Sequence, residues 1–530
     1  MTDSRAAAPA ATPADIHRAS RNTIGDAVAR SAARNGSRPA LAFGDRLWTF
    51  TELELASNRL AHRLTGLGLN KGDRVAAYGR NSDAYLLLWL ACTKAGLIHV
   101  PVNYALVHQE LAYILSQSGC HALFADTDLQ PQVDAVQQDL NIAIAGSLHG
   151  GGNPDVLAMA RAPGEDSPPT LELTDTDVVQ ILYTSGTTSD PKGAMHTHRS
   201  LLTEYGACQY HLDIRADDRS LAALPLYHSA QMHVFTMPML LTGGYSRLIH
   251  TPTPEAILSL LAEERLNAFF APPTVWISLL RHPAFDEDRL RHMTKLYYGA
   301  SIMPAQVVDE LGRRLPDAGL YNCYGQSEIA PLATVLLPDE HGARPTSAGR
   351  PLNTVLTRIV DPLTGQDCPP GEPGEIVHRS PQLMVGYWDK PEATEDAFRD
   401  GWFHSGDLGY RDEAGYLYVV DRIKDVVNTG GVLVASRDVE DVLYRHDAVA
   451  EVAVIGVPDD KWIEAICAVV VVKDGHPEDA ESLLTHARAN LAPFKVPKHI
   501  RFVPQLPKNT AGKLLKRKLR ETFAPLDTND

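Results

Sequence analysis

Residues 183–194 read Tyr-Thr-Ser-Gly-Thr-Thr-Ser-Asp-Pro-Lys-Gly-Ala, and the architecture follows most directly from this stretch. The run before it, residues 178–183, is β-branched and aromatic, which predicts a strand. A strand that ends in glycines and hydroxyls can wrap a phosphate chain, because backbone N–H groups approach the oxygens and a lysine adds charge. It is not a Walker A loop, since no Gly-Lys-Ser or Gly-Lys-Thr closes it. We predict a phosphate-binding loop; the alternative is a solvated linker. The loop residues expected at the phosphates are Thr184, Ser185, Gly186, Thr187, Thr188 and Lys192.

Helix and strand patterns alternate on the N-terminal side of this loop. Capping-box spacing from Thr51 to Glu54 predicts a helix start there, and a second helix is expected over 84–95. Apolar strands are expected over 75–78 and 97–102. This alternation indicates an α/β sheet, and the Gly- and Pro-rich residues 146–170 read as a surface connection.

A second boundary is expected near residues 421–424. A strand pattern precedes it at 415–420, and short strand and helix patterns follow it. The remaining residues are sufficient for a small α+β domain of about 100 residues. The chain therefore has at least two domains, as its length of 530 residues also suggests.

Charge, apolar runs and cysteine spacing disfavour several classes of function. The formal net charge of −16 argues against nucleic-acid binding, with a local basic exception at 508–520. The longest apolar run, 84–92, is too short to span a bilayer. No Cys-x-x-Cys motif occurs, so we expect neither a zinc ribbon nor a disulfide framework, and the cysteines fit a cytoplasmic protein. The six cysteines are Cys92, Cys120, Cys208, Cys323, Cys368 and Cys467.

Two carboxylates stand out. Glu328 follows an aromatic and Gly-containing loop, and a carboxylate beside a triphosphate is favourable only with a cation between them, so we expect it to bind magnesium. Asp407 follows Ser405 and Gly406, and a carboxylate there can accept both hydroxyls of a ribose. The alternatives are a surface glutamate and a turn aspartate.

The chain resembles the adenylate-forming family of acyl-CoA ligases, firefly-type luciferases and peptide-synthetase adenylation domains. The resemblance runs from about residue 48 to 516 and rests on separated motifs in the family's order. These motifs are the phosphate loop at 183–193, Tyr-Asn-Cys-Tyr-Gly-Gln-Ser-Glu at 321–328, His-Ser-Gly-Asp at 404–407, Asp-Arg-Ile-Lys-Asp at 421–425 with glycines at 430 and 431, and the closing segment 507–513.

The resemblance implies a nucleotide site. It places the adenine against a backbone edge and an aromatic segment, the ribose against Asp407 and Arg422, and magnesium near Thr184 and Glu328. A serine stands at 327 where the family commonly has threonine, so the hydroxyl for phosphate contact is kept. The adenine and phosphate residues are Gly299, Ala300, Ser301, Asn322, Tyr324, Gly325 and Ser327.

The resemblance also implies the catalytic and moving parts. Lys513 is expected to stabilise the charge that builds between the acid and the α-phosphate; by spacing alone it is one more solvated lysine. His228 is expected to gate the carboxylate pocket, the alternative being a packed histidine. Lys424 marks the hinge, and Gly430 with Gly431 would line the pantetheine tunnel.

We therefore expect an α/β protein with a large N-terminal domain of stacked α/β layers (1–420), a hinge (421–425) and a small, mobile α+β C-terminal domain (426–530). The expected activity is ATP-dependent acyl-CoA ligation with ATP, Mg²⁺ and coenzyme A. An acyl-AMP ligase that loads a carrier protein and a specialised ligase for a bulky natural-product acid remain alternatives. An amino-acid adenylation domain is disfavoured because Ser229 stands where an aspartate would bind the substrate ammonium. The expected partners are a carboxylic acid and CoA, without nucleic acid or a membrane-spanning segment, and a homodimer stays open.

The sequence indicates the polarity of the acid but not its chain length or ring structure. An apolar acid is favoured over a dicarboxylic one, because the expected pocket residues include no arginine or lysine. These residues are Gln231, Met232, Val234, Tyr298 and Met303. Leu433, where the family usually has asparagine, and Ser189, where glycine is commonest, leave the efficiency of each half-reaction open.

Overall fold

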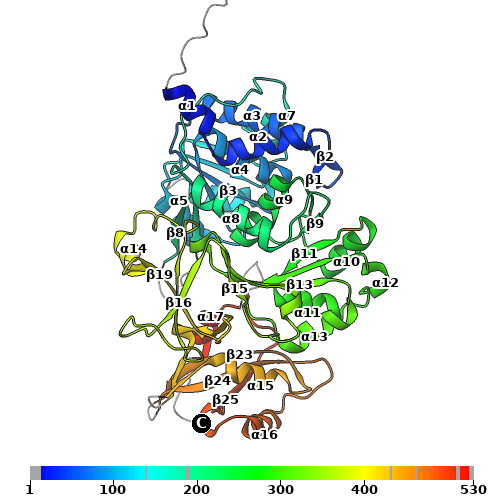
Figure 1. The fold of residues 1–530 in the computed structure, drawn as a ribbon, viewed down its shortest axis with the longest axis vertical. Coiled ribbons are helices and arrows are strands. Elements are labelled where there is room, and N and C mark those ends of the chain that lie inside the picture. Colours follow the sequence, from blue (N-terminus) through cyan, green and yellow to red (C-terminus); the bar gives the residue numbers. More distant parts are fainter. Residues whose placement is uncertain are drawn as a thin grey trace, which may run out of the picture.

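Two large β-sheets with helices around them form the N-terminal part of the protein (Figure 1). The computed structural model describes residues 13–137, 140–184, 190–429, 432–459, 462–508 and 514–523. The first described helix lies at one end of the molecule and the C-terminal elements lie at the other.

The first large sheet has nine strands and is mostly parallel. Its order is β15 (Arg350–Pro351), β14 (Leu332–Leu336), β13 (Gly319–Gly325), β12 (Lys295–Gly299), β11 (Ala268–Ala271), β9 (Arg219–Ala222), β10 (Tyr245–Leu248), β1 (Pro39–Phe43) and β2 (Arg46–Thr49). The second has six strands in the order β6 (Ile144–Ser147), β5 (Ala122–Ala125), β3 (Arg74–Tyr78), β4 (Ile98–Val102), β7 (Val178–Thr184) and β8 (Lys192–Thr197). The predicted strands before the phosphate loop are confirmed.

Helices cover these sheets, and α4 lies deepest because it is apolar on nearly all sides and buried along its whole length. The N-terminal helices are α1 (Pro13–Ser20), α2 (Ile24–Asn35), α3 (Phe50–Gly66), α4 (Asp83–Ala95), α5 (His108–Ser118), α6 (Gln130–Gln137), α7 (Val156–Arg161), α8 (His198–His211), α9 (Met237–Thr242), α10 (Pro254–Glu263), α11 (Pro273–Arg281), α12 (Glu287–Leu290), α13 (Ala305–Arg314) and α14 (Pro391–Ala397). A π-helical segment, Ala230–Thr236, precedes α9.

Two local predictions were wrong. The capping box that starts α3 is formed by Thr49 and Glu52, so Thr51 already lies inside the helix. The expected connection 146–170 contains the end of β6 and the helix α7, which the side chain of Asp155 caps by accepting from the Ala158 N–H at 2.8 Å. A short helix in a Gly- and Pro-rich stretch gives too few turns to show a period.

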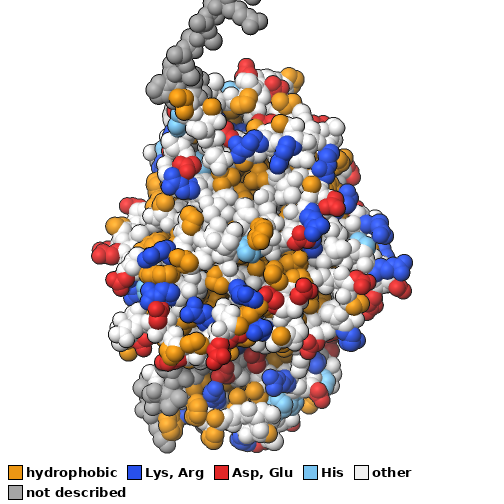
Figure 2. All heavy atoms as spheres, viewed as in Figure 1, with side chains coloured by type: hydrophobic (Ala, Val, Ile, Leu, Met, Phe, Trp, Pro, Cys, Tyr) orange, Lys and Arg blue, Asp and Glu red, His pale blue; other side chains and the backbone are white. Residues whose placement is uncertain are grey.

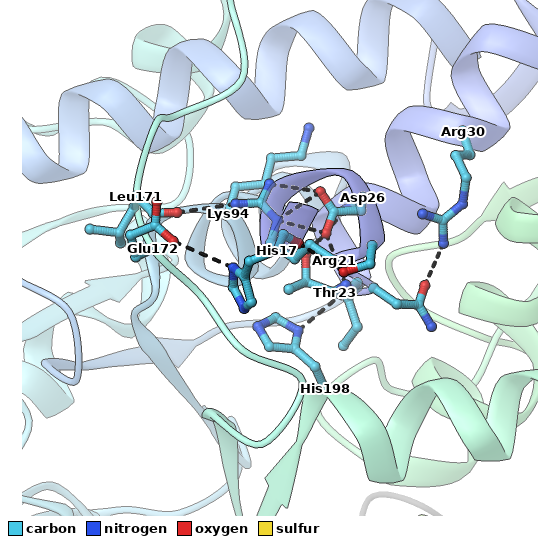
Figure 3. Close-up of polar contacts among 12 residues, drawn as sticks. His17, Arg21, Thr23, Asp26, Arg30, Lys94, Leu171, Glu172 and His198 are labelled. Atoms are coloured by element: carbon cyan, nitrogen blue, oxygen red, sulfur yellow. Dashed lines mark hydrogen bonds and ion pairs between the residues drawn. The ribbon is translucent and has the colours of Figure 1, made fainter. Parts of the chain in front are cut away.

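Figure 3 shows how the first helices attach to the domain. Arg21 donates to the carboxylate of Asp26, which also caps α2 by accepting from the N–H of Thr23. The N–H of Ile24 donates to Nδ1 of His198 at 3.1 Å, which joins α2 to the first residue of α8.

A third sheet lies between the large sheets and the C-terminal elements, with strands β16 (Leu356–Val360), β17 (Gly374–Arg379), β18 (Phe398–Arg399), β19 (Trp402–Arg411) and β20 (Leu417–Arg422). The C-terminal sheet contains β21 (Val427–Thr429), β22 (Val432–Val434), β23 (Val449–Asp459), β24 (Ile463–Val472) and β25 (His499–Phe502). Its helices are α15 (Ser436–Tyr444), α16 (Ala480–Asn490) and α17 (Lys516–Phe523). These elements have apolar cores of their own, built only from residues after 426. The expected fold class, a large α/β domain with a small α+β domain, is confirmed.

The helices, cysteines and surface charges bear on whether the chain has a membrane span, a disulfide or a charged patch. None of the helices in the described ranges has the length and apolar character needed to cross a bilayer. All six cysteines are buried and free. On the face in Figure 2, basic and acidic side chains are interspersed.

Candidate active site

The carboxyl ends of parallel strands meet at one edge of the nine-stranded sheet, where open α/β sheets bind ligands. There β12 and β13 lie in register, with Gly299 opposite Cys323. A Cβ on Gly299 would lie 2.2 Å from the carbonyl oxygen of Cys323, so only glycine allows this approach. The next residue, Ala300, has a φ of 64°. The two segments predicted to surround the adenine are therefore neighbours.

Three predicted nucleotide residues form one polar chain. The hydroxyl of Tyr324 donates to Oδ2 of Asp407 at 2.8 Å, and Nε of Arg422 pairs with Oδ1 at 2.6 Å. Asp407 is only 3% exposed. Its charge raises the pKa of the Arg422 guanidinium, and burial followed by the same carboxylate raises the pKa of the Tyr324 phenol. Asp407 is thus held by two side-chain partners at the edge of the sheet.

The phosphate-loop strands form a hairpin in which Thr184 pairs with Lys192. The Thr184 hydroxyl donates to the Lys192 carbonyl at 3.4 Å. The Lys192 ammonium lies 5.3 Å from the ring centroid of Tyr387, whose hydroxyl donates to Oε1 of Glu328 at 3.1 Å. Tyr387 therefore connects the predicted phosphate lysine with the predicted magnesium carboxylate.

Sequence reasoning missed Tyr387. The segment that carries it runs along the free edge of β8, where Val385 N–H donates to the Met195 carbonyl and Trp388 N–H donates to the Gly193 carbonyl. Neither a periodic pattern nor a motif with a known spacing marks this loop. The one sequence signal is the pair of aromatic residues after Gly386.

Ser327 and Glu328 lie in the turn after β13. The carbonyl of Ser327 accepts from Nε2 of His196 at 2.8 Å, and its hydroxyl lies 3.0 Å from that of Ser229. Burial lowers the pKa of His196 to about 4, so it is neutral and donates. His228 immediately precedes Ser229, which brings the predicted gate segment to the turn that carries Glu328. His196 and His198 have different partners and do not form a shared metal site.

A cavity of about 1310 Å³ opens between the N-terminal and C-terminal elements. Its wall includes these predicted nucleotide and hinge residues: Ala300, Ser301, Asn322, Tyr324, Gly325, Asp407, Arg422 and Lys424. C-terminal basic residues line the other side, among them Arg437, Lys508 and Lys516. Thr184, Lys192, His228, Gly299, Ser327 and Glu328 are not part of this wall, although Glu328 is close enough to raise the pKa of Arg422. The side chain of Asn322 donates to the Ser347 carbonyl at 2.8 Å.

The five residues expected to line the acid pocket are packed in the interior. Gln231 and Tyr298 are each 1% exposed, and none of the five lies on the wall of the cavity. The hydroxyl of Tyr298 lies 3.0 Å from Nε2 of His341, and burial raises the pKa of the Tyr298 phenol, so this buried polar group is neutral and has a partner.

The expected hinge residues have partners on opposite sides. Arg422 binds Asp407, whereas Asp421 accepts from the Ser436 hydroxyl at 2.6 Å and Asp425 pairs with Arg520 at 2.6 Å. Arg422 therefore pairs with the predicted ribose carboxylate, whereas the two neighbouring aspartates bond to C-terminal elements. Burial lowers the pKa of Lys424, which lies in a short 3₁₀ turn, Ile423–Asp425.

Several predicted residues lie outside the described residues. They are Ser185, Gly186, Thr187 and Thr188 in the phosphate loop, Gly430 and Gly431 after the hinge, and Lys513. Their roles stay predictions.

Two family descriptions match the chain: "AMP-binding enzyme" over residues 28–388 and "AMP-binding enzyme C-terminal domain" over 438–513. The chain is 37% identical over 503 residues to a feruloyl-CoA synthase of Amycolatopsis sp, which covers 94% of this chain and 99% of the relative. It is 33% identical to the long-chain-fatty-acid–CoA ligase FadD13 of Mycobacterium tuberculosis over 480 residues, covering 90% and 93%.

Among solved structures, ATP-bound MatB from Rhodopseudomonas palustris superimposes with a TM-score of 0.88 at 31% identity, covering 95% of this chain and 99% of MatB. The match extends through both parts of the chain. The protein therefore belongs to the adenylate-forming, AMP-binding enzyme family, in its acyl-CoA synthetase branch.

Proposed function

We propose that this chain is an ATP-dependent acyl-CoA ligase that activates an apolar carboxylic acid. In the first step a carboxylate oxygen attacks the α-phosphorus of ATP, an O–P bond forms and pyrophosphate leaves. In the second step the deprotonated thiol of CoA attacks the acyl carbon, a C–S bond forms and AMP leaves.

The observation that carries this proposal is the Asp407–Arg422 pair on the wall of a cavity bounded by both parts of the chain. A carboxylate there can accept from the ribose hydroxyls, with Arg422 exchanging part of its ion pair for the nucleotide. Asn322, Tyr324 and the backbone from Gly299 to Ser301 would flank the adenine. The space is large enough for a nucleotide and a second substrate.

Magnesium is part of the proposal. Within the described ranges, no group of three or more His, Cys, Asp and Glu side chains is arranged to hold a metal. Magnesium in ATP-using enzymes takes one or two carboxylates and completes its shell with phosphate oxygens and water, so a single carboxylate fits. Glu328 and the Thr184 hydroxyl would hold it, and when bound it would offset charge on the triphosphate. Lys192, beside Tyr387, would add a second positive charge.

The remaining roles are proposed on the resemblance. Lys513 would stabilise the charge between the acid and the α-phosphate, His228 would gate the acid, and the glycines at 430 and 431 would admit pantetheine. The domain limits 1–420 and 426–530 with a hinge at 421–425 are supported by the separate C-terminal cores and by the gap between the two family matches. A homodimer stays a prediction that size-exclusion chromatography with light scattering can check.

A screen of acids tests this function. The purified protein is incubated with MgATP, CoA and one acid at a time, and thioester is detected by mass spectrometry. Ferulate and a long-chain fatty acid are the acids named for the two similar enzymes. We expect thioester and AMP with an apolar acid. If neither AMP nor thioester forms with any acid, the result contradicts the proposal. Acyl-AMP without thioester would favour a carrier-protein ligase.

A further inference from the structure

The turn that carries Glu328 has an unusual backbone. We call residues 326–331, between β13 and β14, the glutamate turn. Its two ends meet where Gly325 pairs with Leu332. A Cβ on Gly325 would lie 1.8 Å from the carbonyl oxygen of Pro331, and Ala330 has a left-handed φ of 80°. A non-glycine residue in this region is strained, so surrounding contacts must hold the turn.

Glu204, on α8, supplies one of these contacts from the interior. It is fully buried, with 0% exposure. Its Oε1 accepts from the N–H of Leu332 at 3.0 Å and from the thiol of Cys208 at 3.3 Å. Its Oε2 accepts from Nε2 of Gln382 at 2.5 Å.

Gln382 extends the contact to the other side of the turn. It is also 0% exposed, and Nε2 donates to the carbonyls of Leu332 at 3.0 Å and Ile329 at 3.4 Å. Its side-chain oxygen accepts from the hydroxyl of Thr354, which orients the amide. The side chains of Glu204 and Gln382 therefore hold the backbone immediately after Glu328.

The remaining contacts hold the start of the turn and the carboxylate itself. Met384 N–H donates to the carbonyl of Glu328 at 2.8 Å, and Tyr387 donates to its side chain. Met384 and Tyr387 lie on the same loop as Gln382. Glu204 anchors this loop and the turn at once, since it bonds to Gln382 and to Leu332.

A carboxyl group is costly at this position. Burial raises the pKa of Glu204 to about 8, and the titratable groups that face it, Tyr205, Cys208 and Cys323, are themselves kept neutral by burial. Among the described residues the polar partners of Glu204 are the N–H of Leu332, the thiol of Cys208 and the amide of Gln382, none of which is a cation. A leucine would fit the apolar surroundings of α8 but would leave the N–H of Leu332 without its acceptor, so the carboxyl group serves these hydrogen bonds rather than packing.

We propose that Glu204, together with Gln382, is a positioning residue that fixes the carboxylate of Glu328 for MgATP. This inference rests on the proposed function, in which Glu328 holds magnesium. Outer partners that orient a metal-binding carboxylate commonly change metal affinity or activity by about 10- to 100-fold when removed. Glu204 touches neither substrate nor metal and acts only through the turn.

The test compares three variants of the full-length protein in two half-reactions. Glu204→Leu keeps volume but removes the acceptor of the Leu332 N–H. Glu204→Gln keeps that acceptor through the amide oxygen but replaces the oxygen that accepts from Gln382 by an amide nitrogen. Cys208→Ala removes a different contact to Glu204 and is the packing control. Acid-dependent ATP–pyrophosphate exchange is measured over a magnesium titration, and CoA transfer is measured from supplied acyl-adenylate.

We expect Glu204→Leu to raise the magnesium concentration for half-maximal exchange by about 10- to 100-fold. Its CoA transfer should stay near wild type, which also shows that the variant is folded. Glu204→Gln should restore part of the magnesium response, because it keeps the acceptor for the Leu332 N–H, and Cys208→Ala should resemble wild type.

Three results would overturn the positioning role of Glu204. An unchanged magnesium titration in Glu204→Leu, or an equal loss in both half-reactions, would overturn the positioning role. Equal defects in Glu204→Gln and Glu204→Leu would also overturn it. If wild type itself shows no acid-dependent exchange, the proposed function fails instead.

Discussion

At the scale of single residues, the site is organised around two carboxylates, each held by neighbouring side chains. Asp407 is paired with Arg422 and Tyr324, and Glu328 accepts from Tyr387. Each carboxylate is nearly buried, where an electrostatic contact is stronger than in water. Changes of charge at these positions should therefore affect catalysis more than stability.

Glu328→Gln tests the magnesium role. The amide oxygen can still accept from the Tyr387 hydroxyl, so the turn should keep its shape while losing its charge. We expect exchange activity to fall by about 10- to 1000-fold and the magnesium requirement to rise. Magnesium titration of pyrophosphate exchange measures this.

The matched control is Tyr387→Phe, which removes the donor to Glu328 but leaves the charge. It should affect activity less than Glu328→Gln. Unchanged magnesium dependence in Glu328→Gln would show that Glu328 is not a metal ligand.

Buried histidines give the protein a pH-dependent stability. His99, His196 and His378 are 0% exposed, and burial lowers the pKa values of His196 and His378 to about 4 and that of His99 to about 3. The unfolded chain takes up these protons below about pH 6.5, whereas the folded protein does not. Their contribution is therefore complete above pH 6.5 and is lost as the pH falls toward 4. Glu204, with a raised pKa, acts in the opposite direction.

His378→Phe isolates one of these contributions. Between pH 6 and pH 5 the free energy of unfolding of wild type should fall more steeply than that of the variant, by up to about 1.4 kcal/mol per pH unit. Urea unfolding at several pH values measures both slopes. Parallel slopes would mean that His378 is not kept neutral by the fold.

At the scale of elements, local patterns gave strands and helices but not their neighbours. The β-branched run at 178–183 predicts β7 to within one residue of its end. The prediction succeeds because a central strand needs apolar residues on both faces. The loop with Gln382 and Tyr387 could not be predicted, since its partners on β8 and in the glutamate turn are distant in sequence. The predicted acid-pocket residues lie near the motifs in sequence, and the apolar character that suggests a pocket also suits a packed core.

The hinge is an element-scale prediction. Arg422 is bonded to the N-terminal side, while Asp421 and Asp425 are bonded to the C-terminal side, so a rotation at Lys424 must break the contact between Asp421 and Ser436. Lys424→Pro fixes φ near −65° and removes an N–H. We expect pyrophosphate exchange to persist while thioester formation is blocked.

Lys424→Ala is the control, because it removes the same side chain without restricting the backbone. It should form thioester faster than Lys424→Pro. Normal thioester formation in the proline variant would place the hinge elsewhere or make rotation unnecessary.

At the scale of the whole molecule, we expect the small domain to serve one nucleotide site in two orientations. The first would bring Lys513 to the site for adenylation, and the second would bring Gly430 and Gly431 for CoA transfer. The fold class and the family could be predicted because several motifs occur in one order over nearly the whole chain. The acid could not, since its pocket depends on packing among residues that have no fixed spacing.

The most direct test of the central claim is the ratio of the two half-reaction rates in Lys513→Ala. We expect acid-dependent pyrophosphate exchange to fall by about 100-fold or more, the usual scale for a lost electrostatic group, because the lysine acts only in the first orientation. CoA transfer from supplied acyl-adenylate should change little. An equal loss in both rates, or no loss in exchange, would contradict the account.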